Sequence, residues 1–335
     1  MERVIEEKLY LENWNSSCKE YKINVITDII NERKLPFSIK KVEEFSANNM
    51  SVETVILEYE DSEFVFIPGC LEVTLGWDSN TWKMGENLIK DLEEDFKEEI
   101  EYYKETYEEM KEDYEEQIKE AKAKNDVDAA KELIEEMNEE LENYEMDQTF
   151  EERLNELSEY IDISTSPVRK TSIKPMIVER DLHSVRKYNT YKEFREELKN
   201  TIFTIPTEDE YEYICGGGKR TLYRWGDSLK EELSAIYSIG TINENNDILY
   251  SPNMFGLHIL YDSYMYELVD DECFYKGGDG GCTLCGGDGT RVVVPVYSTF
   301  YVPTISENIS WDIEKGYCYY RRIINNIVWS FFRDL

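Results

Sequence analysis

The chain has 335 residues, 41% of them hydrophobic, so it can bury one large core or two ordinary ones. Its formal net charge of −35 predicts repulsion from nucleic acid and from anionic membranes, and excludes the basic stripe that duplex binding requires. Seven Cys without an apolar leader, and no apolar run of about 20 residues, indicate a cytoplasmic protein whose thiols are free or metal-bound.

The first 60 residues are predicted to form a small N-terminal extension of helix and strand. One helical face carries the apolar residues Tyr21, Val25, Ile26, Ile29 and Ile30. Pro36 ends that pattern. Residues 54–58 and 64–67 have the composition of two strands, joined by a turn at residues 60–62.

Residues 86–162 differ in kind from the rest of the chain. They hold 31 acidic and 9 basic residues, a net charge of −22. Apolar residues recur in steps of three and four, which predicts two helices with heptad-like seams: Phe96, Ile100, Tyr103, Tyr107, Met110 and Tyr114, then Val127, Ala130, Ile134, Met137, Leu141 and Tyr144.

A turn at residues 124–126 would join these helices, with Asp126 capping the second, and a shorter third helix would follow at Phe150. Two interpretations of this inserted acidic hairpin stay open. In the first, the apolar seams of its helices simply pack against each other in a solvated hairpin. In the second, its acidic face recruits a basic partner or mediates self-association.

Residues 61–85 and 163–335 are predicted to form one discontinuous, irregular α+β domain around the insertion. Its clearest local signal is a capping box, in which Thr207 caps a helix and Glu210 is the third residue of that helix. This favours a structural role for Glu210 over a pairing with Glu208 for acid–base catalysis. Residues 216–218, all Gly, end the helix.

Separate segments of this domain resemble the formylglycine-generating enzyme family, also called the sulfatase-modifying-factor domain. They are FVFIPG at 64–69, IPTEDEYEY at 205–213, YRWGD at 223–227, SPNMFGL at 251–257, YELVD at 266–270, YKGG at 275–278, and Gly316 and Tyr317 with Arg321. The resemblance implies a variant of the C-type-lectin-like fold over residues 64–85 and 163–324.

The family enzyme oxidises a peptide cysteine to formylglycine with oxygen, using Cu(I) held by two cysteines. By this resemblance, Cys282 matches the first copper ligand, because it lies four residues after Gly278. The second family ligand falls on Gly287, whereas the second thiol here is Cys285, two residues early. Two thiolates suit Cu(I) because both ligand and metal are soft.

Other interpretations of Cys282 and Cys285 remain: a zinc or other structural metal site with Cys273 or Cys318 added, a reversible CxxC redox pair, or incidental thiols in a Gly-rich surface loop. The candidate binding residues around them are Asp279, Asp288, Tyr317 and Arg321. A calcium site, which this part of the fold often supports, would lack the Gly and Asn of the family motif.

Two functions are therefore carried forward. The favoured one is a divergent lectin-like scaffold that binds a peptide or protein. The alternative is a copper-dependent oxidase of a peptide cysteine, with Cys282 and Cys285 as catalytic and metal-binding residues.

Overall fold

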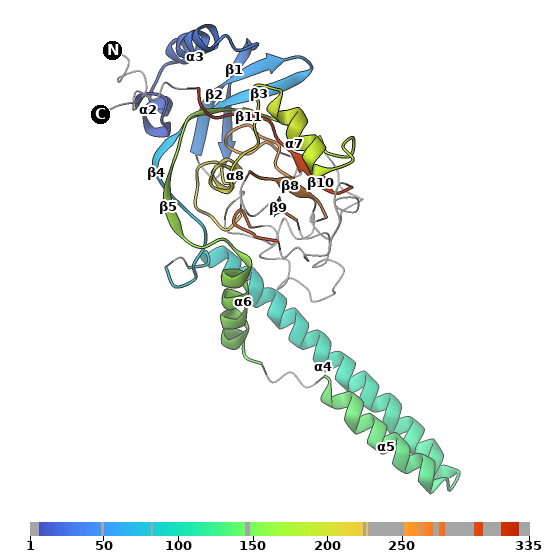
Figure 1. The fold of residues 1–335 in the computed structure, drawn as a ribbon. Helices are drawn as coiled ribbons and strands as arrows, with labels where there is room; N and C mark the ends of the chain where they lie inside the picture. Colours follow the sequence, from blue (N-terminus) through green and yellow to red (C-terminus); the bar gives the residue numbers. More distant parts are fainter. Residues whose placement is uncertain are drawn as a thin grey trace. The chain divides into compact units, whose positions relative to one another are not determined.

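The computed structural model describes residues 7–47, 50–81, 83–144, 148–223, 226, 251–260, 262, 264–270, 275–278, 298–303 and 316–327. The chain divides into two compact units, one of Met1–Gly85 with Glu159–Leu335 and one of Glu86–Ser158 (Figure 1). Helices and largely antiparallel sheets make up the first unit, so the protein has the predicted α+β class.

Two helices open the described part of the first unit, α2 (Leu11–Asn15) and α3 (Lys19–Arg33). The predicted apolar face of α3 is buried at Val25, Ile26 and Ile29. The helix ends at Arg33, and its C-cap Lys34 has a left-handed φ of 53°, two residues before the proline predicted to stop it. Sequence periodicity therefore located this helix and its buried face.

The main sheet has the strand order β1-β2-β3-β6-β11 and is antiparallel throughout. Its strands are β1 (Ser38–Ala47), β2 (Met50–Tyr59), β3 (Ser62–Ile67), β6 (Met176–Glu179) and β11 (Ile323–Ile324). Because β1 and β2 share this sheet with strands from the middle and end of the chain, residues 1–60 belong to the main unit. The predicted N-terminal extension of helix and strand is therefore continuous with the main sheet.

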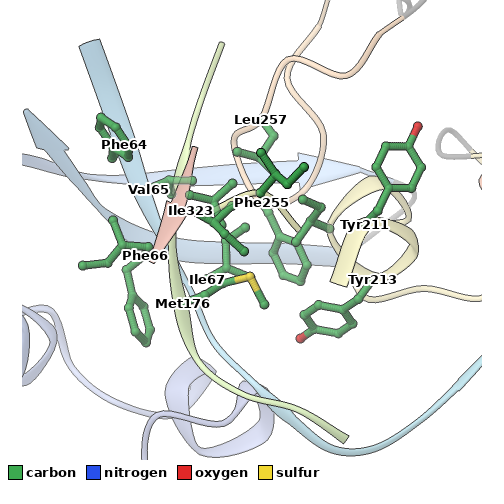
Figure 2. Close-up of a cluster of buried hydrophobic side chains, with 14 of the residues drawn as sticks. Phe64, Val65, Phe66, Ile67, Met176, Tyr211, Tyr213, Phe255, Leu257 and Ile323 are labelled. Atoms are coloured by element: carbon green, nitrogen blue, oxygen red, sulfur yellow. The ribbon is translucent and has the colours of Figure 1, made fainter. Parts of the chain in front are cut away.

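Hydrophobic side chains fill the space between this sheet and helix α8 (Glu208–Cys215). Figure 2 shows residues of β3, β6 and β11 converging on aromatic residues of α8 and of the loop at 253–257. The labelled members of this core are Phe64, Val65, Phe66, Ile67, Met176, Tyr211, Tyr213, Phe255, Leu257 and Ile323. This core fixes α8 against the sheet and so positions everything that its polar face contacts.

Two smaller sheets also lie within the described residues of the first unit. One pairs β4 (Cys70–Leu75) with β5 (Arg169–Ile173), and the other has the order β7-β10-β8-β9. The second contains β7 (His183–Ser184), β8 (Tyr266–Leu268), β9 (Tyr275–Gly277) and β10 (Cys318–Tyr320), with β8 and β10 parallel. Helix α7 (Tyr191–Lys199) lies between β7 and α8 in the sequence.

The acidic insertion forms α4 (Glu86–Ala123), α5 (Val127–Glu142) and α6 (Phe150–Ser164), as predicted. The Asp126 side chain caps α5 by accepting a hydrogen bond from the Ala129 amide at 3.1 Å. Aromatic pairs close the seams, with ring centroids 5.6 Å apart for Phe96 and Phe150. One predicted seam position was wrong, because Val127 is 74% exposed at the start of its helix.

None of the helices in the described ranges is both long enough and apolar enough to cross a membrane.

Candidate functional site

The first turn of α8 is built around the predicted capping box. Thr207 Oγ1 accepts a hydrogen bond from the Glu210 amide at 3.2 Å, and Glu210 Oε2 accepts one from the Thr207 amide at 2.9 Å. The structural role predicted for Glu210 is thereby confirmed. The cap fixes the direction in which the neighbouring carboxylates Glu208 and Asp209 leave the helix.

A buried lysine contacts the face of α8 one turn further on. Lys276 and Glu212 have fully buried side chains, with Nζ 2.9 Å from Glu212 Oε1 and 3.0 Å from Glu208 Oε1. Ser166 Oγ also donates a hydrogen bond to Glu212 Oε1. Buried charges are stable only when paired and hydrogen-bonded, so these contacts hold β9 against α8.

A second cation reaches the same carboxylates from β5. Arg169 Nε donates to Asp209 Oδ1 at 2.6 Å, and its Nη2 lies 3.1 Å from Glu212 Oε2. Burial would lower the pKa of Arg169, but Glu212 and Asp209 outweigh that effect and raise it. Two cations and three carboxylates thus tie together β5, α8 and β9.

A second fully buried ion pair joins β8 to the residue after β10. Arg321 Nε lies 3.1 Å from Glu267 Oε1, and neither side chain has solvent exposure. The guanidinium also donates to the carbonyls of Glu179, Arg180 and His258. Burial raises the pKa of Glu267, although the charge and hydrogen bond of Arg321 act against that rise.

These contacts bear on two predicted binding residues. Arg321 is an interior group that cross-links the chain, so its described contacts are structural. Tyr317, four residues earlier, is 45% exposed, and its carbonyl accepts a hydrogen bond from the Tyr266 amide. The structure therefore gives the two residues different surroundings, and a ligand-binding role for either stays a prediction.

The loop at 253–257 is organised by one buried side-chain amide, that of Asn253. Asn253 Nδ2 donates to the carbonyls of Ile214 and Cys215 at 2.6 and 3.2 Å. Its Oδ1 accepts from the amides of Phe255 and Leu257 at 3.0 and 3.1 Å. Asn253 thus provides hydrogen-bond donors to carbonyls at the end of α8 and also holds the turn at residues 253–257.

A histidine and an arginine share one buried carboxylate at the end of β6. Glu179 Oε1 lies 2.6 Å from both His183 Nε2 and Arg322 Nη2. Burial alone would raise the pKa of Glu179, but the hydrogen bonds from Arg322 and His183 prevail and lower it to about 2. The group is a stably ionised anchor between β6, β7 and β11.

A surface pocket of about 230 Å³ lies beside the first turn of α8. It is lined by Ser172, Ile173, Lys174, Thr207, Asp209, Glu210, Asn325 and Asn326. All but one of these side chains are polar, and they come from three separate segments of the chain. Such a pocket can exchange hydrogen bonds with a small polar group.

The predicted thiol site, with Cys273, Asp279, Cys282, Cys285 and Asp288, lies outside the described residues. Cys318 is buried in β10. Within the described ranges no three His, Cys, Asp or Glu side chains come together as a metal-binding group. The copper, zinc and calcium hypotheses therefore stay predictions.

Sequence reasoning missed three residues that organise this region: Glu212, Lys276 and Asn253. Glu212 stands among acidic neighbours that suggest solvent exposure, although its position one turn beyond Glu208 was visible. Asn253 was noticed only as part of a motif. No family model, no curated protein and no solved structure matches the chain.

Proposed function

We propose that this chain is a divergent relative of the formylglycine-generating enzyme family, a lectin-like scaffold that acts as a peptide- or protein-binding module. The proposal rests on two buried ion pairs, Glu212 with Lys276 and Glu267 with Arg321. Glu212 and Lys276 come from two separated segments with family-like sequence, and so do Glu267 and Arg321. If the likeness of these segments to the family were accidental, there would be no reason for their charged residues to meet in the interior.

Binding is favoured over catalysis for two reasons. The second family copper-ligand position is occupied by Gly287, and Cys285 would present its thiolate from a different place. The polar pocket beside α8 offers hydrogen-bonding groups held by a rigid helix and sheet. Fold alone does not decide the matter, because one scaffold hosts many functions.

The alternative function is a copper-dependent oxidase of a peptide cysteine. It is supported by the firm anchoring of the chain just before the thiols. Lys276 is locked into the buried network, and the Gly278 amide donates to the Met265 carbonyl at 2.8 Å. The segment bearing Cys282 therefore starts from a fixed point, as an ordered metal site would require.

A copper titration separates the two functions. The chain would be titrated with Cu(I) against a competing chromogenic chelator, alongside Cys282→Ser and a matched control, Cys18→Ser, in which an exposed thiol distant in sequence is removed. The binding-module proposal expects no tight one-to-one copper complex and no formylglycine in cysteine-containing peptides analysed by mass spectrometry. Tight copper binding that survives Cys18→Ser but is lost in Cys282→Ser would establish the alternative.

A further inference from the structure

The pocket beside α8 is assembled from three parts of the first unit. Residues 172–174 contribute the end of β5, residues 207–210 the first turn of α8, and residues 325–326 the segment after β11. Ser172, Lys174 and Asn326 are exposed, so the pocket opens to solvent. A ligand can therefore enter with one end and leave the rest of its length outside.

The acidic side chains that line the pocket are already held in place. Asp209 Oδ1 is fixed by Arg169 Nε, and Glu210 Oε1 accepts from Asn325 Nδ2 at 3.2 Å. Within the described part of the chain, Asp209 Oδ2 and Asn326 Oδ1 have no hydrogen-bond donor. Two oriented acceptors, one of them anionic, thus remain for a ligand that carries several N–H donors.

The lining also supplies hydrogen-bond donors. Among the described residues, neither Ser172 Oγ nor Lys174 Nζ forms a hydrogen bond or ion pair with the protein. A hydroxyl and an ammonium group are therefore available for a carbonyl oxygen. The pocket consequently presents both acceptors for a cation and donors for a neutral or anionic oxygen.

A free peptide N-terminus has this arrangement of groups, because its α-ammonium is followed directly by a carbonyl. We propose that the pocket captures the free N-terminus of a peptide or protein partner. The ammonium lies between Asp209 and Asn326, and the first carbonyl faces Ser172 and Lys174. A net charge of −35 draws such a cationic end toward the protein. A peptide C-terminus is disfavoured, since its carboxylate would face Asp209 and Glu210.

This assignment rests on the proposed peptide-binding function and gives that function a location. It is tested with twenty hexapeptides that differ in their first residue, each fluorescently labelled at its C-terminus and made with a free or an acetylated N-terminus. Fluorescence anisotropy would measure binding to the full chain. At least one free peptide should bind, and acetylation should weaken it at least 10-fold.

Two further readouts follow from the chemistry. Affinity for the free peptide should fall between pH 7 and pH 9, because the α-ammonium group loses its proton near pH 8. Asn326→Ala and Ser172→Ala should each weaken binding several-fold while leaving the thermal unfolding midpoint unchanged. The matched control Asn200→Ala, an exposed Asn that bonds only its own helix, should bind as the parent chain does.

The outcomes separate the two proposals. Peptides that bind equally well when acetylated, or equally well to Asn326→Ala and Ser172→Ala, would overturn the N-terminus pocket and leave peptide binding intact. Failure of every peptide to bind, together with copper-dependent oxidation, would overturn both. Free alanine that competes as strongly as the peptide would overturn the assignment to a peptide end.

Discussion

Replacing Lys276 by Met removes the charge but keeps much of the side-chain volume in a fully buried position. Glu212 then keeps Arg169, whose Nη2 lies 3.1 Å from Glu212 Oε2, as a cationic partner, and the same Nη2 lies 3.9 Å from Glu208 Oε2. Removing one member of a buried ion pair costs about 3–5 kcal/mol. Since Arg169 compensates in part, we expect Lys276→Met to lower the free energy of unfolding by about 3 kcal/mol, a large share of the ~5–15 kcal/mol typical of a domain.

Urea denaturation followed by circular dichroism measures this loss, with the dependence on denaturant compared between variants. Lys276→Arg, which keeps the positive charge, is the control and should lose much less. The combination with Glu212→Gln should be less destabilised than the sum of the two single variants, because the groups are coupled. A loss below about 1 kcal/mol for Lys276→Met would match an exposed pair and refute the argument from burial.

Three more predictions concern stability. Asn253→Ala removes four buried hydrogen bonds and should cost about 2–4 kcal/mol by urea denaturation, whereas Asn200→Ala should cost little. Gly256→Ala would place its Cβ 2.5 Å from the ring of Phe45, at a residue whose φ is 79°. We expect a destabilisation of about 1–3 kcal/mol, partly relieved by adding Phe45→Leu. No relief in the double variant would show that backbone strain alone is responsible. Glu179 has its pKa lowered from 4.5 to about 2, so its stabilising contribution is complete above pH 4.5 and is lost as the pH falls toward 2. That contribution is on the order of 3 kcal/mol, and Glu179→Gln should flatten the acidic side of a stability–pH profile; an unchanged profile would contradict the assigned pKa.

Local patterns in the sequence predicted the local structure well. The spacing of apolar residues located α3 and the helices of the insertion, and Thr207 with Glu210 located the start of α8. These features depend on residues within one or two turns of each other. The position of Asp126 as a cap follows from the same short-range logic.

Long-range pairing could not be predicted in the same way. The composition of residues 54–58 and 64–67 predicted strands within β2 and β3, but not that β3 pairs with β6 more than one hundred residues later. Nor did the sequence indicate that Glu212 and Lys276 meet in the interior, because sequence shows a charge without showing its partner. The pocket depends on three such distant segments and therefore became visible only in the folded chain.

The acidic helices are inserted directly beyond the end of the paired strands β4 and β5. Leu75 pairs with Arg169, and the Trp77 amide donates to the Ser166 carbonyl at 2.9 Å just beyond that pair. The outgoing and returning strands are therefore already clamped together before the first helix begins. Because closing a longer loop adds little entropic cost, the paired strands β4 and β5 can hold an inserted segment of very different lengths. A shorter hairpin or a fluorescent reporter grafted there should leave the register of β4 and β5 intact.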